Sequence, residues 1–230
     1  MLVRLIAAAF LLLAAPVAAS ARPVVVELFT SEGCSSCPPA DAYLSDLSRD
    51  RPEVLPLAFH VTYWNSLGWQ DPYSLEAATQ RQTAYSARFH SYSYTPEMVI
   101  DGQTGLVGSD RRAVEAAIKT AQQADEAGVD VSGVRHGGTL SVTVGPGAGR
   151  GQVLLIGYDA AHVTQVGRGE NAGRALSESN IVRSIQSVGE WTGAPLKLES
   201  TPPAGERAAI LIQSPDGAII GAARVASGAP

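Results

Sequence analysis

Two cysteines, Cys34 and Cys37, are the residues whose type and spacing most clearly indicate chemistry. They are the only cysteines in the chain and are separated by two serines. The apolar run Val24–Phe29 predicts a strand before them, and the pattern after Pro38 predicts a helix. Backbone N–H groups and the helix dipole favour a thiolate at a helix start. We therefore expect Cys34 to act as a nucleophile and Cys37 as the resolving thiol of a redox pair.

A second interpretation of this pair is a structural disulfide that only fastens a turn. A loop this short removes little entropy from the unfolded chain, so such a bond stabilises weakly. The context of strand, turn and helix favours redox or ligand chemistry instead.

The first residues predict export. Arg4 precedes the apolar run Leu5–Val17, and Ala19-Ser20-Ala21 has the small-x-small pattern of a signal-peptidase site. We assign residues 1–21 to a signal peptide and expect a periplasmic or secreted protein, with no membrane span after signal removal. Outside the cytosol a Cys-x-x-Cys pair can rest as a disulfide.

The charge balance argues against nucleic acid as a partner. The chain of 230 residues has 17 basic and 22 acidic residues, with a net charge of −5. It lacks the basic run that a phosphate-backbone binder needs.

A strand–helix–strand unit places further side chains near the cysteines. The helix after Pro38 should end near Arg51, and Val54–Val61 should form a second buried strand parallel to the first. Ligands of open α/β sheets bind at the carboxyl ends of the strands. The loop after the second strand should therefore face the cysteine turn.

That loop supplies the other candidate residues of the first half. Tyr63, Trp64 and Trp69 are candidate walls for a substrate, although large aromatic side chains also pin loops to a core. His60 is a candidate for proton transfer, or else a structural histidine at a strand end. Glu27, inside the first strand, is a second candidate for proton transfer, or else meets water at the sheet margin.

Three more elements complete the first half. Asp71-Pro72 predicts the start of a helix that runs to about His90. Thr95-Pro96 precedes a third strand, which an Asp-Gly turn connects to an antiparallel fourth strand. Ser109-Asp110 caps a last helix.

This order of elements resembles the thioredoxin fold across residues 23–127, with Cys-x-x-Cys opening the first helix and Thr95-Pro96 before the third strand. The resemblance implies that Pro96 is a cis-proline packed against the dithiol. It also implies that the Thr95 backbone binds an incoming peptide.

At finer grain the chain resembles a family of secreted bacterial proteins known as domain of unknown function 1223. The resemblance implies a thioredoxin-like domain joined to a β-rich one and covers nearly the whole mature chain. Thioredoxins carry a buried acid six residues before the first cysteine, where this chain has Leu28, so the role of Glu27 does not transfer. The segments that carry the resemblance are 27–41, 60–64, 67–69, 81–82 and 169–174.

The sequence pattern of the second half, residues 129–230, predicts an antiparallel sandwich or barrel, because short alternating runs are separated by Gly, Pro and Asn. The expected strands are 129–134, 139–144, 153–158, 163–166, 181–188, 196–198, 208–213 and 219–225. We interpret the glycine-rich segment 145–151 as a hairpin loop, because it lacks the Gly-Lys-Ser/Thr of a phosphate loop. Segment 167–174 is either a solvated loop or a binding loop in which Arg168 and Arg174 hold a carboxylate.

Three hypotheses about function follow. The leading one is an exported thiol–disulfide exchange protein acting on protein or peptide thiols and disulfides, without a cofactor. The first alternative is Cu(I) binding or delivery by the same cysteines, with His60 or Met98 nearby, although the sequence contains no metal motif beyond this pair. The second is a non-catalytic binding module with a structural disulfide. The sequence sets neither the direction of exchange, nor the substrate, nor an oligomeric state.

Overall fold

The computed structural model describes residues 22–124 and 128–228, so the expected signal peptide lies outside the described residues. The first half contains four strands and three α-helices. They are β1 (Val24–Thr30), α1 (Pro38–Asp50), β2 (Val54–His60), α2 (Glu76–Arg88), β3 (Glu97–Ile100), β4 (Thr104–Val107) and α3 (Arg111–Ala124), with the short 3-10 helix η1 (Asn65–Leu67) after β2.

The second half consists of strands. They are β5 (Val131–His136), β6 (Thr139–Val144), β7 (Gly151–Gln165), β8 (Ala175–Trp191), β9 (Leu196–Ser200), β10 (Arg207–Gln213), β11 (Ile219–Arg224) and β12 (Ala226–Ser227).

One mixed sheet runs through both halves of the chain. Its eight strands have the order β11-β10-β7-β8-β2-β1-β3-β4. β1 and β2 are parallel in the register Thr30↔His60, whereas β3 is antiparallel to β1 in the register Phe29↔Glu97. The halves join where β2 pairs in parallel with β8 at Ala58↔Ile181. The sheet therefore brings the carboxyl ends of β1 and β2 together, as the strand–helix–strand unit predicted.

The helices cover opposite faces of the β1–β3 part of the sheet. Leu44 of α1 and Ile118 of α3 pack in one core cluster with Leu28 and other even-numbered residues of β1. Tyr85 of α2 packs on the other face, in a cluster that includes Phe29. All residues of β1 are buried, and they enter two cores in alternation, because successive strand residues point to opposite faces.

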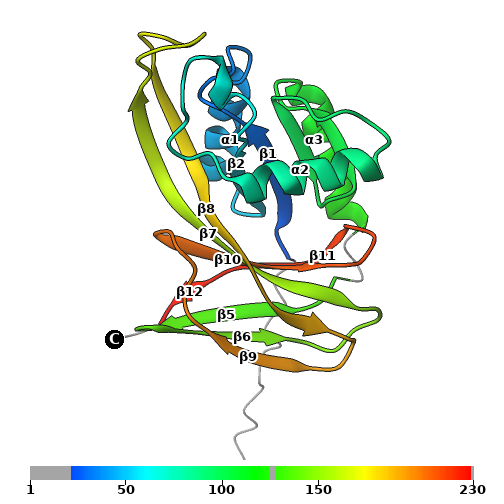
Figure 1. The fold of residues 1–230 in the computed structure, drawn as a ribbon. Coiled ribbons are helices and arrows are strands. Elements are labelled where there is room, and N and C mark those ends of the chain that lie inside the picture. The colour runs from blue at the N-terminus through cyan, green and yellow to red at the C-terminus, as the bar shows by residue number, and fades with distance from the viewer. Residues whose placement is uncertain (1–21, 125–127, 229–230) are drawn as a thin grey trace, which may run out of the picture.

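A second sheet, ordered β12-β5-β6-β9, lies against the far part of the large sheet. Leu140 of β6, Leu155 of β7 and Ile210 of β10 share a third core cluster with the fully buried Trp191. The long strands β7 and β8 run from this region up to the helices (Figure 1).

Three expectations about local structure were wrong. Helix α2 begins at Glu76, because Asp71 caps a separate turn by accepting a 2.8 Å hydrogen bond from Tyr73 N. Segment 145–151 is not a hairpin loop, since β6 pairs with β5 and β9 while β7 pairs with β8 and β10. The two runs 153–158 and 163–166 belong to the single strand β7, whose pairing with β8 continues through a register shift at Gly157/Tyr158.

Candidate disulfide site

Cys34 and Cys37 are joined by a disulfide across the turn between β1 and α1, with their Cα atoms 5.4 Å apart. Cys37 is the N-cap residue of α1, and its carbonyl oxygen accepts hydrogen bonds from Ala40 N and Asp41 N. The two prolines that begin the helix lack the N–H groups that a helix start leaves unpaired. Both cysteines are fully buried at 0% exposure, whereas Ser35 and Ser36 between them are exposed.

Thr95 and Pro96 lie beside this turn. The pairing Phe29↔Glu97 places Pro96 opposite the end of β1, just before the cysteine turn. The Thr95–Pro96 peptide bond is cis, as the resemblance implied. Trp64 Nε1 donates a 2.8 Å hydrogen bond to Thr95 Oγ1, and Trp64 also packs near Gly33. The structure thus brings Trp64, Thr95 and the cysteine turn together.

Trp69 reaches the same turn from the far end of the loop. Its Nε1 donates a 2.7 Å hydrogen bond to Glu32 Oε2, two residues before Cys34. Tyr63 points elsewhere, since its hydroxyl donates to Gln82 Oε1 of α2 at 3.1 Å and the residue is 39% exposed. Among the three predicted wall residues, Trp64 and Trp69 contact residues of this turn or its immediate neighbours.

The loop between β7 and β8, residues 166–174, lies on the cysteine turn; we call it the hairpin tip. Asn171 donates from its side-chain nitrogen to the carbonyl oxygens of Glu32 and Cys34, each at 2.9 Å. Glu170 Oε2 accepts a 3.2 Å hydrogen bond from Ser35 N. The second half of the chain therefore contributes directly to the surroundings of the disulfide.

Several buried titratable side chains surround the turn and its neighbouring strands. His60 Nδ1 is 2.8 Å from Asp71 Oδ2, which also accepts a 2.9 Å hydrogen bond from Glu32 N. His60 Nε2 faces Glu178 Oε1 of β8 at 3.8 Å. Asp41 of α1 accepts a 2.7 Å hydrogen bond from Thr30 Oγ1. We call His60, Asp71, Glu178 and Asp41 the buried charge cluster.

Burial and mutual charge set the pKa values in this cluster. Burial raises the pKa of Asp41 to about 7 and that of Glu178 to about 8. Burial alone would lower the pKa of His60, but the charges of Asp71 and Glu178 raise it to about 10. Burial likewise opposes ionisation of Asp71, yet the nearby His60 charge holds its pKa below the usual value. At neutral pH, an imidazolium–carboxylate pair thus lies beside carboxyl groups that retain protons readily.

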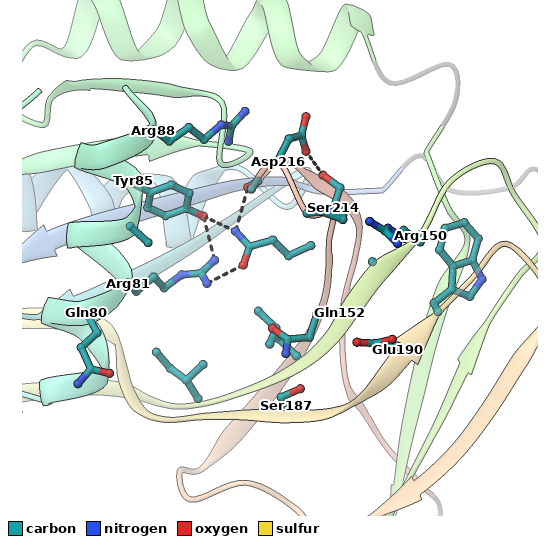
Figure 2. Close-up of a pocket in the computed structure, with 18 of the residues that line it drawn as sticks. Gln80, Arg81, Tyr85, Arg88, Arg150, Gln152, Ser187, Glu190, Ser214 and Asp216 are labelled. Carbon is teal, nitrogen blue, oxygen red and sulfur yellow. Dashed lines mark hydrogen bonds between the residues drawn. The ribbon is translucent and has the colours of Figure 1, made fainter. Parts of the chain in front are cut away.

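Glu27 lies apart from both the disulfide and the buried charge cluster. Its carboxylate accepts hydrogen bonds from Arg81 Nη2 and from the Tyr85 hydroxyl, each at 2.8 Å. Arg81 and Tyr85 line a cleft of about 1080 Å³ between α2 and strands β7, β8 and β10. Figure 2 shows Arg81 and Tyr85 on the α2 side of this cleft. The two side chains are hydrogen-bonded to each other and to Gln213. This cleft is therefore lined in part by a hydrogen-bonded polar network, and the cysteines are not among its lining residues.

Two observations bear on metal binding. Met98, a candidate soft ligand at sequence level, is fully buried in the core cluster with Leu28. Within residues 22–124 and 128–228, no group of three or more His, Cys, Asp or Glu side chains is arranged to hold a metal ion.

In the same described part, no helix is long and apolar enough to span a bilayer.

Sequence reasoning missed Asp41, Asp71, Glu178 and Asn171 as neighbours of this site. Asp41 follows Cys37 by one helical turn, a spacing that could have indicated it. Asn171 lies in segment 167–174, which was considered as a binding loop, but through its arginines only. Asp71 was interpreted as a helix cap, whereas Glu178 and Asn171 come from the far half of the sequence.

Comparisons with known proteins agree with a fold that spans both halves. The family model described as "Protein of unknown function (DUF1223)" matches residues 25–213. A crystal structure of protein AGR_C_4864 from Agrobacterium tumefaciens is similar with a TM-score of 0.80 and 29% identity, covering 93% of this chain and 98% of that one. HBP35 of Porphyromonas gingivalis is similar in fold, with a TM-score of 0.58 and 14% identity, covering 92% of this chain and 79% of that one. The search of curated proteins gives no match.

Proposed function

Because the chain belongs to the DUF1223 family of proteins of unknown function, we propose a function from its own residues: thiol–disulfide exchange through Cys34 and Cys37. The observation that carries this proposal is the Cys34–Cys37 disulfide across the turn that opens α1. In this place the positive end of the α1 helix dipole favours a thiolate over a thiol.

The arrangement around the disulfide supports the same activity. The order β2-β1-β3-β4, with α1 and α3 on one face and α2 on the other, supports the proposal that this half is a thioredoxin-like domain. Thr95 and Pro96 lie beside the turn, where an extended peptide could add its backbone next to the sulfur. The acidic protein is proposed to work after export, where a disulfide persists.

In this reaction a thiolate of a reduced partner attacks the Cys34 sulfur and the Cys34–Cys37 bond breaks. Cys37 leaves as a thiolate and takes up a proton. A second partner thiol loses its proton and attacks the mixed disulfide, which releases Cys34 and oxidises the partner. The reverse sequence reduces a partner disulfide, and the reduction potential of the pair sets the direction.

Replacement of each cysteine tests the proposal. Cys34→Ser should abolish exchange with protein disulfides in an insulin reduction assay. Cys37→Ser should accumulate mixed disulfides, since the resolving thiol is absent. The proposal fails if both variants behave like the unaltered protein in insulin reduction and in oxidation of a reduced substrate. Measurement of the potential of the Cys34–Cys37 couple then separates a reductant from an oxidant.

A further inference from the structure

The sulfur atoms belong to residues without solvent exposure. Cys34 and Cys37 are both 0% exposed, although exchange requires a thiolate to approach one sulfur in line with the disulfide bond. Some part of the surrounding chain must therefore move before any external thiol reacts. The neighbouring segments are α1 itself, the loop that carries Trp64, the Thr95-Pro96 segment and the hairpin tip.

The hairpin tip is the neighbour that can move with the least loss of structure. β7 and β8 remain paired up to Gln165↔Ala175, so the loop beyond this pair can lift while both strands stay intact. Most of its residues are exposed, and Gly169 and Gly173 adopt positive φ angles of 76° and 79°. By contrast, Trp64 is tied to Thr95, and moving Cys37 would disrupt the start of α1.

Two side chains fasten the tip to the turn. Asn171 is fully buried, and its amide bonds the carbonyl oxygens on both sides of Gly33. Arg174 Nη1 donates a 2.8 Å hydrogen bond to Asn171 Oδ1, which fixes the orientation of the amide. Glu170 adds the more exposed contact with Ser35 N. Asn171 therefore makes the main contact that holds the tip against the cysteine turn.

We propose that the hairpin tip is a cover over the Cys34–Cys37 disulfide, which must lift before a thiol reacts, so that partner proteins able to displace it react in preference to small thiols. This inference rests on the proposed function for its substrate class. The cover itself concerns only access to the disulfide, which can be measured whether or not the protein exchanges with other proteins.

The test is the rate at which dithiothreitol reduces the disulfide of the oxidised mature protein, followed by acid quenching and thiol labelling. Asn171→Ala removes both hydrogen bonds to the turn and should raise this rate about tenfold, as expected when two ordinary hydrogen bonds are lost. Ala172→Ser is the matched control, because Ala172 is an exposed residue of the tip directly after Asn171. It should leave the rate within about twofold.

A second variant keeps the test decisive if Asn171→Ala does not fold. Arg174→Ala removes only the exposed side chain that orients Asn171, and it should raise the rate in the same direction by a smaller factor. The cover is refuted if the folded Asn171 variant, or Arg174→Ala in its place, is reduced no faster than the unaltered protein. If Asn171→Ala speeds reduction by dithiothreitol but neither reduced thioredoxin nor insulin reacts with the protein, the cover stands, whereas the proposed function and the preference for protein partners are refuted.

Discussion

The indole nitrogen of Trp64 donates a 2.8 Å hydrogen bond to the hydroxyl of Thr95, so the loop after β2 is tied to the residue that precedes Pro96. Trp64 is partly exposed, whereas Gly33 beside it is buried. One side chain therefore both contacts the cysteine turn and fixes the segment proposed to bind a peptide. This double contact makes Trp64 the residue of choice for probing the wall of the site.

Trp64→Ala should slow exchange with a protein substrate more than exchange with oxidised glutathione. A protein is large enough to contact the ring while its disulfide reaches Cys34, whereas glutathione contacts fewer of the surrounding side chains. Second-order rates for insulin and for oxidised glutathione measure the difference.

Trp64→Phe is the matched control for this variant, because it keeps an aromatic ring while losing the N–H donor to Thr95 and the second ring of the indole. Its rate with insulin should lie between those of Trp64→Ala and the unaltered protein. Equal losses with both substrates, together with a lower melting temperature, would instead assign Trp64 a purely structural role.

Glu27→Ala should destabilise the protein by roughly 3–5 kcal/mol and leave the intrinsic rate of thiol exchange unchanged. The substitution leaves the Arg81 guanidinium buried without its carboxylate, and breaking a buried ion pair from one side carries this cost. Urea unfolding measures the stability, and exchange with oxidised glutathione in the folded range measures the chemistry. Glu27→Gln, which keeps a hydrogen-bond acceptor, should lose less. A changed pH profile of exchange in the folded variant would instead support the candidate role of Glu27 in proton transfer.

His60→Ala should also be strongly destabilising, because it leaves Asp71 buried beside Glu32 without the positive charge of the imidazolium. Adding Asp71→Asn should recover part of the loss, since the amide oxygen can still accept the hydrogen bond from Glu32 N while the unpaired charge is gone. Unfolding free energies of both single variants and the double variant provide the coupling energy. Strictly additive losses would mean that the 2.8 Å contact between His60 and Asp71 contributes nothing.

Local patterns predicted most of the first half. Continuous apolar runs indicated β1 and β2, and the three-and-four spacing of apolar residues indicated α1. These patterns reflect which face of an element is buried, and that information is local. The parallel pairing of Ala58 with Ile181 is a contact between distant segments, so no local pattern indicated that the sheet continues into the second half.

The residues of the site likewise fall into those that local motifs predicted and those that distant contacts bring in. The cysteine pair and Thr95-Pro96 are recognisable because their chemistry is tied to short motifs. Asn171 lies in a glycine-rich segment that also suits a solvated loop, and its contact with Cys34 depends on the reach of the β7–β8 hairpin. Glu178 lies in the polar run 177–180, outside the expected strand 181–188, yet β8 buries it against His60. Polar residues buried by distant contacts have no signature of their own in one sequence.

The buried charge cluster should make stability fall as the pH rises from about 4.5 to about 10. Asp41 and Glu178 have folded pKa values of about 7 and about 8, above their usual 3.8 and 4.5, so the folded state keeps protons that the unfolded chain releases. His60 has a folded pKa of about 10 against a usual 6.5, so its contribution is complete below pH 6.5 and is lost as the pH rises through 10. All three groups act in the same direction between these limits.

Glu178→Gln should remove one part of this dependence. Glutamine resembles the protonated carboxyl group and cannot ionise, so the variant should match the unaltered protein near pH 5 and exceed it at pH 8. Each 1 kcal/mol of stability gained at pH 8 should appear as a rise of roughly 2–4 °C in melting temperature for a chain of this size. Glu190→Gln removes the same charge from an exposed position on the same strand, and its melting curve should follow the unaltered protein. Melting temperatures of the three proteins from pH 5 to pH 9 decide the matter, because a Glu178 variant parallel to the other two throughout would mean that this carboxyl group does not titrate with folding.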